Sequence, residues 1–156
     1  MTTATQALQV GDAAPAFSAQ DDTGKRWSLK DLKGKTVVLY FYPKDSTPGC
    51  TTEACDFRDH YKTFLKKGAV VLGVSADSAK SHQNFKQKQS LPFPLLVDED
   101  KTICRAYGVW DKKTLYGREF MGIVRSTFVI DEHGLLKDVV RKVKVAGHVQ
   151  SILEAL

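Results

Sequence analysis

Two runs of β-branched and aromatic residues constrain the fold most strongly, because the segment between them has the periodicity of a helix. The runs are TVVLYFY at residues 36–42 and AVVLGVSAD at residues 69–77, and each has the composition of a buried strand. Between them, apolar residues recur at intervals of three and four: Ala54, Phe57, Tyr61 and Phe64. This spacing predicts a helix from residue 48 to about residue 67. A strand, a helix and a second strand in this order are typical of an α/β domain.

The rest of the chain continues the alternation. We expect a helix at 78–90, a strand at 93–98, a short helix at 101–109, a strand at 120–131, its hairpin partner at 135–143 after the turn EHG, and an amphipathic helix at 145–156. A chain of 156 residues is long enough for one well-packed core and short for two, which predicts a single domain over residues 1–156. The predicted fold class is α/β, with a central mixed β-sheet flanked by helices.

Composition narrows the classes of partner. The net charge of +5 comes from lysines and arginines interleaved with Asp and Glu, and RKVK near the end is a short cluster, so we expect no nucleic-acid partner. No apolar run approaches the length of a membrane span, so we expect no membrane partner. The amino-terminal MTTATQALQV has neither a basic start nor a sustained apolar segment, which predicts a cytoplasmic protein without a secretion signal.

Two of the three cysteines lie five residues apart in STPGCTTEAC, at the start of the predicted helix. Thr47 suits the N-cap, and Pro48 suits the first helical position, where its missing N–H is no loss. Cys50 then falls near the third helical position, where unpaired N–H groups and the positive end of the helix dipole favour a thiolate. The sequence therefore predicts that Cys50 ionises readily. The same argument does not extend to Cys55, more than one turn further along.

The spacing of Cys50 and Cys55 restricts how they can react with each other. In an unbroken helix, residues five apart have Cα atoms roughly 8.7 Å apart, from the rise and rotation per residue. A disulfide requires about 4.4–6.8 Å, so the two cysteines are unable to bond while the helix is intact. A redox cycle is open to them only if the first turns unwind, and Gly49, Thr51 and Thr52 lower the cost of unwinding because they are poor helix formers.

Two alternatives give these cysteines other roles. A free cysteine is often a small buried apolar residue, and this is the interpretation we favour for Cys104. A metal site is the second alternative, with ligands drawn from Cys50, Cys55, Cys104 and one of His60, His82, His133 or His148. Structural zinc sites usually pair ligands two to four residues apart, and no two cysteines here have that spacing. We therefore expect no metal and no other cofactor.

A set of motifs resembles one known family. Pro43, Thr47 and Cys50 form the pattern P-x-x-x-T-x-x-C, which resembles the active-site signature of the peroxiredoxins, thiol peroxidases with a thioredoxin-like fold. A second cysteine five residues on is similar to the bacterioferritin-comigratory-protein, or Q, subgroup. The likeness also covers GDAAPAFSAQDDTGKRWSLKDLKGK, RAYGVW and RSTFVIDEHG, in the family's order.

The resemblance implies a role for each matching residue. Cys50 would be the peroxidatic cysteine, which attacks peroxide and becomes a sulfenic acid, and Cys55 would be the resolving cysteine. Pro43 would shield the pocket from water, although it is also an ordinary strand terminator. The Thr47 hydroxyl would hydrogen-bond the thiolate and the peroxide.

Arg125 and Glu53 complete the implied site. Arg125 matches the family's active-site arginine, and Glu53 matches an acidic position that helps to hold it. Independently of the family, Arg125 interrupts an apolar strand, and a buried guanidinium needs an anionic partner. The alternative is that Arg125 lies at a sheet edge with its head group in water.

The function implied is reduction of hydrogen peroxide and alkyl hydroperoxides, followed by an intramolecular Cys50–Cys55 disulfide that thioredoxin or a similar dithiol reductant reduces. An internal partner for Cys50 favours a monomer. Two rival functions remain: a disulfide oxidoreductase, which typically uses the closer C-x-x-C spacing, and a redox sensor or chaperone-like module with little turnover. Sustained peroxide consumption with catalytic thioredoxin distinguishes these possibilities.

Overall fold

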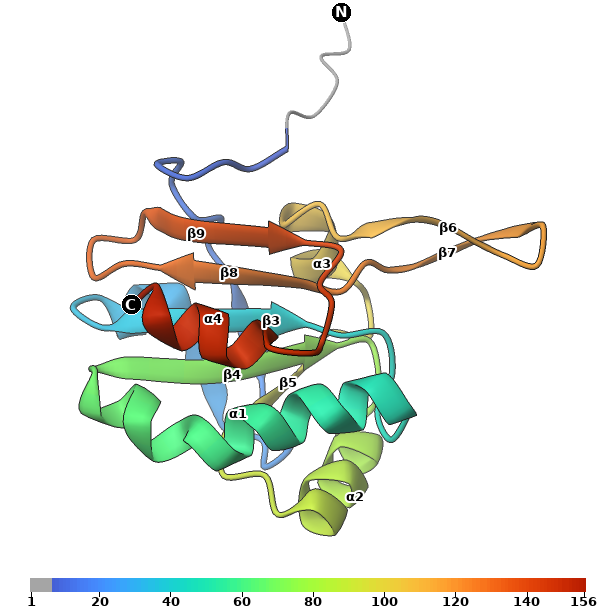
Figure 1. Ribbon diagram of the computed structural model, residues 1–156, viewed down its shortest axis with the longest axis horizontal. Coiled ribbons are helices and arrows are strands. Elements are labelled where there is room, and N and C mark those ends of the chain that lie inside the picture. Colours follow the sequence, from blue (N-terminus) through green and yellow to red (C-terminus); the bar gives the residue numbers. More distant parts are fainter. Residues whose placement is uncertain (1–6) are drawn as a thin grey trace, which may run out of the picture.

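A five-stranded sheet forms the framework of the protein, with strand order β5-β4-β3-β8-β9 (Figure 1). The computed structural model describes residues 7–156. Residues 1–6 lie outside the described residues. They form the first part of the amino-terminal segment in which we expect no secretion signal.

β3 (Thr36–Phe41) lies in the middle of this sheet. It runs parallel to β4 (Ala69–Ser75), which pairs in parallel with β5 (Leu95–Val97). On its other side β3 pairs antiparallel with β8 (Ser126–Ile130), and β8 pairs antiparallel with β9 (Leu136–Arg141). The prediction of a mixed sheet with antiparallel strands at one side is confirmed.

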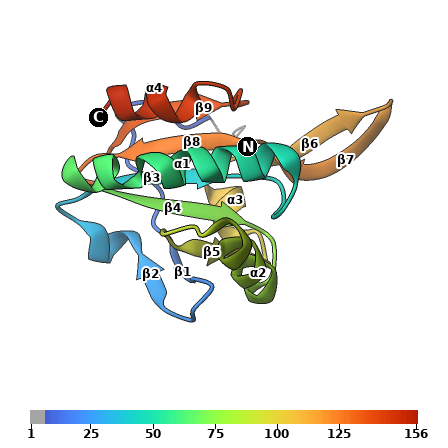
Figure 2. The same cartoon turned by 60° about the horizontal axis from the view of Figure 1, so that its bottom comes forward.

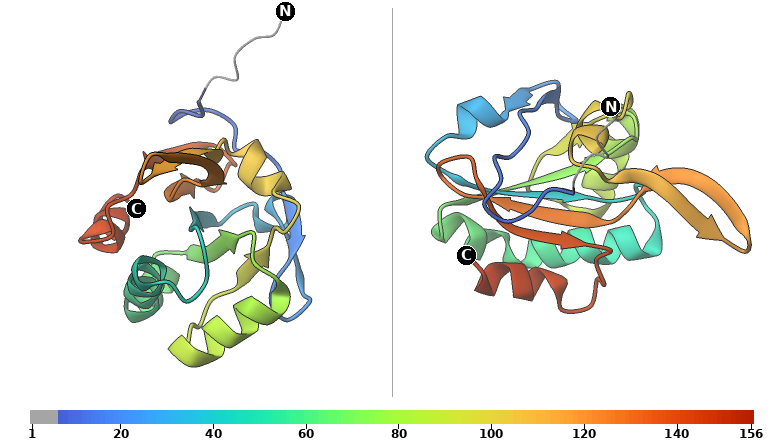
Figure 3. Two further views of the ribbon diagram at one scale, coloured as in Figure 1. Left: turned by 90° about the vertical axis from the view of Figure 1, so that its right-hand side faces the viewer. Right: turned by 90° about the horizontal axis from the view of Figure 1, so that it is seen from above.

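The helices cover both faces of this sheet. They are α1 (Pro48–Lys66), α2 (Ala79–Gln89), α3 (Thr102–Ala106) and α4 (His148–Glu154), and each falls inside its predicted range. α1 and α4 lie on one face, and α3 lies on the other (Figure 3). Among residues 7–156, none of the helices combines the length and apolar character that crossing a bilayer demands.

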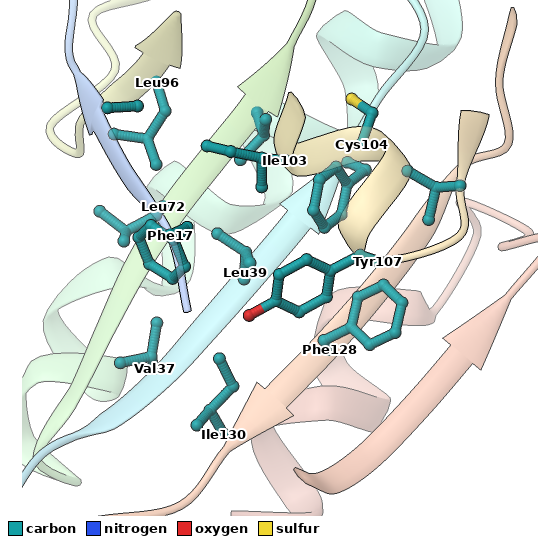
Figure 4. Packing of buried hydrophobic residues seen from close by; sticks show 14 of the residues in the cluster. Phe17, Val37, Leu39, Leu72, Leu96, Ile103, Cys104, Tyr107, Phe128 and Ile130 are labelled. Atoms are coloured by element: carbon teal, nitrogen blue, oxygen red, sulfur yellow. The ribbon is translucent and has the colours of Figure 1, made fainter. Parts of the chain in front are cut away.

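Alternate residues of β3 build two separate cores. Leu39 packs with Phe17, Tyr107 and Phe128 on the face that carries α3 (Figure 4). Tyr40 points to the opposite face, where it joins the side chains of α1 and α4. Because both faces are covered, β3 is buried along almost its whole length, which explains why its sequence is continuously apolar rather than alternating.

The segment before β3 contains elements that the sequence patterns did not predict. β1 (Ser18–Gln20) and β2 (Arg26–Ser28) form a small antiparallel pair, and a short 3-10 helix, η1 (Leu29–Leu32), follows them. Strands of three residues are too short to display a period of two, so hydrophobic patterning gives no signal for them.

The predicted strand at 120–131 is wrong, because two strands from different sheets share that apolar run. β7 (Arg118–Ile123) pairs with β6 (Trp110–Leu115) in a hairpin that projects beyond the rest of the molecule (Figures 1 and 2). β8 then begins at Ser126 in the central sheet. The hairpin turns at Tyr116 and Gly117, which both have positive φ, as a two-residue type I′ turn requires. A continuous apolar run in the sequence does not indicate where one strand ends and a strand of another sheet begins.

Substitution of Gly73 in β4 tests how tightly side chains pack on the face of the sheet that α1 covers. A Cβ at this position would lie 2.9 Å from Leu95 Cδ2 and 3.0 Å from the ring of Tyr40. We expect Gly73→Ala to lower the free energy of unfolding by about 1–3 kcal/mol through overpacking, measured by equilibrium urea denaturation. Gly122→Ala is the matched control, because its Cβ would meet the flexible side chain of Lys113 and the half-exposed ring of Phe120 on the projecting hairpin. An equal loss in both variants would contradict this explanation.

Candidate active site

Cys50 lies in the first turn of α1, directly after the loop that leaves the end of β3. Its side chain is 2% exposed and packs with the core on the α1 face of the sheet. Because the loop is short, the end of β3 fixes where α1 begins and therefore where the sulfur lies.

Arg125 reaches the same place from a distant part of the sequence. It is the residue before β8, and β8 begins where β3 ends, because Ser126 pairs with Phe41. Figure 1 shows the end of β3, the start of β8 and the start of α1 on the same side of the molecule. The pairing of two strands thus brings Arg125 to a helix that begins 77 residues earlier in the chain, at Pro48.

The guanidinium of Arg125 bridges a carboxylate and the thiol. Its Nη1 donates to Glu53 Oε1 at 2.7 Å, and its Nη2 donates to Cys50 Sγ at 3.3 Å. The side chain of Arg125 is 16% exposed, so the alternative that its head group lies in water is wrong. A Cβ on Gly49 would lie 3.2 Å from Nη2, so the absence of a side chain there allows this close approach.

Glu53 is fully buried one turn after Cys50, and burial changes its ionisation. Burial raises the pKa of Glu53 to about 7, although the neighbouring Arg125 opposes the shift. Its second oxygen, Oε2, and the hydroxyl of Tyr40 are buried polar atoms without a hydrogen-bond partner among the described residues. Near neutral pH the site can therefore hold Glu53 either as an acid or as a carboxylate that shares Arg125 with the thiolate.

Lys113 is a second cation near this site, and the sequence patterns did not single it out. It lies on β6, and its Nζ donates to the Ile123 carbonyl at 3.0 Å, two residues before Arg125. Burial and the charge of Arg125 lower the pKa of Lys113, whereas Cys50 acts in the opposite direction. A lysine on a polar hairpin strand gives no sequence signal, since only the fold of the hairpin brings it close.

Thr47 and Pro43 occupy the loop before α1. Thr47 is the N-cap residue, as predicted, but its side chain makes no capping hydrogen bond to the helix. Its hydroxyl donates instead to the Lys44 carbonyl at 2.8 Å, and within residues 7–156 it makes no hydrogen bond to Cys50. The oxygen of Thr47 keeps its lone pairs free to accept a hydrogen bond. Pro43 is half-buried at the start of the loop.

Cys55 lies further along the same unbroken helix and is not in contact with Cys50. All the cysteines are free thiols, and Cys55 is half-buried, with its Sγ 3.5 Å from Gln89 Oε1 at the end of α2. Cys104 lies in the core on the opposite face of the sheet (Figure 4), where burial and the nearby Asp98 raise its pKa. Cys104 is therefore both remote from Cys50 and resistant to ionisation.

The groups that could hold a metal ion do not include the cysteines. Among residues 7–156, the side chains that converge in this way are those of Asp45, Asp77 and His82. Asp45 lies in the loop before α1, Asp77 lies in the loop after β4, and His82 lies in the first turn of α2.

Two solved structures illustrate the fold that this chain shares with known proteins. A structure of the Xanthomonas campestris bacterioferritin comigratory protein superposes with a TM-score of 0.87 at 45% identity, covering 95% of this chain and 94% of that one. A mutant structure of the Xylella fastidiosa PrxQ protein gives a TM-score of 0.90 at 38% identity, covering 96% and 95%. The fold is thus the thioredoxin-like fold of the peroxiredoxins.

Sequence comparison defines the family. The AhpC/TSA family model matches residues 10–139, and the peroxiredoxin Bcp of Bacillus subtilis is 51% identical over 149 residues, which cover 96% of this chain and 95% of that protein. The chain therefore belongs to the AhpC/TSA family and, within it, to the peroxiredoxins of the Bcp, or Q, subgroup. It is a thiol-dependent peroxidase.

The raised pKa of Glu53 predicts a pH-dependent cost of folding. In the unfolded chain this carboxyl ionises near 4.5, whereas the folded protein retains the proton up to about pH 7. The folded state binds more protons in this window, so ionisation of Glu53 lowers stability as pH rises from 4.5 to 7, by about 3 kcal/mol in total. We expect Glu53→Gln to gain stability relative to the wild type across this window, measured by urea denaturation at several pH values. A difference that does not change with pH would contradict the assignment.

Proposed function

We propose that Cys50 is the peroxidatic cysteine and that it reduces hydrogen peroxide and alkyl hydroperoxides through a sulfenic acid. Its thiolate forms a bond to the distal oxygen of the peroxide while the O–O bond breaks. The hydroperoxide proton passes to the departing oxygen, which leaves as an alcohol or, from hydrogen peroxide, as water. Sulfur keeps the distal oxygen and is oxidised by two electrons.

The observation that carries this proposal is the guanidinium of Arg125, held between Glu53 and Cys50. A permanent cation 3.3 Å from the sulfur favours the thiolate, which is the nucleophile. The same group lies where negative charge develops on the departing oxygen, and a preorganised donor there lowers the barrier. Glu53 prevents Arg125 from turning away, since a buried carboxylate oxygen 2.7 Å from Nη1 holds it in place.

Thr47 and Pro43 complete the pocket in this proposal. With its proton donated to Lys44, the Thr47 hydroxyl can accept a hydrogen bond from the hydroperoxide O–H and align it for attack. Pro43 offers an apolar wall and no N–H group, so it limits the access of water to the thiolate.

Regeneration requires Cys55 and an external reductant. After the first turns of α1 unwind, the Cys55 thiol attacks the sulfenic acid, a disulfide forms between Cys50 and Cys55, and water leaves. A dithiol protein, for which we propose thioredoxin, then returns two electrons and two protons by thiol–disulfide exchange. Because the resolving thiol is on the same chain, we propose that a monomer is sufficient. The Xanthomonas campestris relative is described in terms of alkyl peroxide reduction, which supports this substrate class.

Replacing each cysteine tests the division of roles. We expect Cys50→Ser to consume no peroxide beyond the uncatalysed rate, because its hydroxyl does not supply a thiolate. Cys55→Ser is expected to consume one equivalent and then stall with a sulfenic acid that dimedone traps. Peroxide loss in the presence of thioredoxin, its reductase and NADPH gives both readouts.

Cys104→Ser is the matched control for these variants, because Cys104 lies on the other face of the sheet. It is expected to retain full turnover. Sustained turnover in Cys55→Ser, or undiminished peroxide loss in Cys50→Ser, would refute the assigned roles.

Arg125→Lys tests the electrostatic part of the mechanism. A lysine ammonium is a single point charge and does not reproduce the planar fork that contacts Glu53 and Cys50 together. We expect the second-order rate of peroxide reduction to fall by about 10²–10³-fold, the usual cost of losing a preorganised donor. Arg105→Lys, at an exposed position on α3, is expected to leave the rate unchanged. A rate in Arg125→Lys within twofold of the wild type would rule out this role.

A further inference from the structure

A network of buried polar groups ties the loop before α1 to α2. Its centre is Asp45, which is 6% exposed although it lies in a loop. The Asp45 carboxylate accepts hydrogen bonds from the Tyr42 hydroxyl at 2.5 Å and the Ser81 hydroxyl at 2.8 Å, and it faces His82 Nδ1 at 2.7 Å. The Asp45 backbone N–H donates to Asp77 Oδ2 at 2.8 Å. One residue thus connects the end of β3, the loop after β4 and the first turn of α2.

His82 is positively charged in this arrangement. Its Nδ1 faces the Asp45 carboxylate, and its Nε2 faces the Leu96 carbonyl at 2.8 Å. Both partners are acceptors, so both ring nitrogens must donate, and a ring that donates twice is an imidazolium. The result is an ion pair whose side chains are 0% and 2% exposed.

The surroundings of His82 determine how this charge depends on pH. The ionisable groups that face the ring are Asp45, Asp77 and Tyr42, and β5 presents the Leu96 carbonyl. Burial disfavours the charged ring, but the hydrogen bond and the charge of Asp45 outweigh burial and raise the pKa of His82 above 6.5. The ion pair is therefore present below pH 6.5 and is lost as pH rises through this elevated pKa.

A turn with an uncommon backbone conformation lies between the ion pair and the reactive helix. Ser46 follows Asp45 and has a φ of 63°, a left-handed conformation that is uncommon for residues other than glycine. Thr47 comes next, and α1 begins at Pro48. The anchor at Asp45 therefore fixes the turn that sets the position of Cys50.

The anchor and the unwinding of α1 involve different contacts. On α1, Cys55 and Arg58 contact the side chain and the carbonyl of Gln89 at the end of α2. The anchor lies before Cys50 in the chain, whereas the turns that must unwind lie between Cys50 and Cys55. The two ends of α2 thus hold the two sides of the segment that has to rearrange.

From this geometry we infer that Asp45 and His82 are positioning residues, which hold α1 in the peroxide-reactive helical form and oppose the unwound form required for the Cys50–Cys55 disulfide. The inference rests on the function proposed above. A buried ion pair can add little net stability and still favour one arrangement over others, which is the effect we propose here. Asp45 Oδ2 and His82 Nδ1 lie at hydrogen-bond distance and share a proton, so the cluster with Asp77 serves as this anchor and not as a metal site.

His82→Gln tests the inference, because it removes the charge and one of the two ring contacts. Reduced protein is mixed with peroxide, quenched at short times with an alkylating reagent, and analysed by mass spectrometry. We expect formation of the Cys50 sulfenic acid to slow by about tenfold, since the sulfur is displaced. We expect the following disulfide step to accelerate severalfold, since the unwound form is more populated. A general loss of structure would instead be detected by urea denaturation, as a weakened or lost cooperative unfolding transition.

Lys86→Gln is the matched control. It breaks another ion pair of α2, between Lys86 and Asp22, that does not touch the loop before α1. Both rates should remain within twofold of the wild type. Unchanged rates in His82→Gln, equal slowing of both steps, or the same changes in Lys86→Gln would overturn the inference. Ser81→Ala removes a single hydrogen bond to Asp45, so it should change both rates in the same directions as His82→Gln but by a smaller factor. This variant provides the test if His82→Gln does not fold.

Hydrogen exchange separates this inference from the proposed function. In the reduced protein, we expect the amides of residues 44–54 to exchange faster in His82→Gln than in the wild type. Corrected for intrinsic exchange, the wild-type rates should rise above pH 6.5 as the imidazolium is lost, by more than the rise that ionisation of Glu53 causes in both proteins. A wild type that forms no Cys50–Cys55 disulfide with peroxide would refute the proposed function, whereas equal exchange in both proteins would refute the anchor.

Discussion

The antiparallel pairing of β3 with β8 is the constraint on which the active site depends. Phe41 at the end of β3 pairs with Ser126 at the start of β8, so the residue before β8 and the loop after β3 lie next to each other. Arg125 and Cys50 come together for this reason, at 3.3 Å. A shift of the register by one residue would turn every side chain of β8 to the other face and would carry Arg125 away from the thiol.

The site combines groups whose charges depend on one another. Glu53 and Cys50 can both be anionic, and both contact the single guanidinium of Arg125. The three groups lie in a buried place from which most water is excluded. Burial raises the pKa of Glu53 to about 7, so the number of anions that compete for Arg125 changes within the physiological range. Lys113 adds a second cation close by. Such balanced charge in a buried place is typical of functional sites.

In the proposed catalytic cycle, the first turns of α1 meet two opposing requirements. Their helical form presents Cys50 to Arg125, whereas a disulfide with Cys55 requires that form to be lost. Pro48 supports the start of the helix, but Gly49, Thr51 and Thr52 contribute little to its stability. On the inference above, contacts with α2 influence this balance, because the start of the helix is weak by itself. The network around Asp45 is one such set of contacts.

The sequence alone was sufficient to predict several of the central elements and to single out the candidate residues of the site. Period and composition were sufficient for β3, β4 and the helices, since long apolar runs and regular spacing are local properties. The motif around Cys50, together with Arg125 and Glu53, also lies in the sequence itself. Tertiary structure alone decided the rest, including the division of one apolar run into β7 and β8, the approach of Lys113, the hydroxyl bond of Thr47 to Lys44 and the burial of His82 against Asp45. Each of these depends on contacts between residues far apart in the chain or on the path of a loop, and hydrophobic patterning carries no information about either.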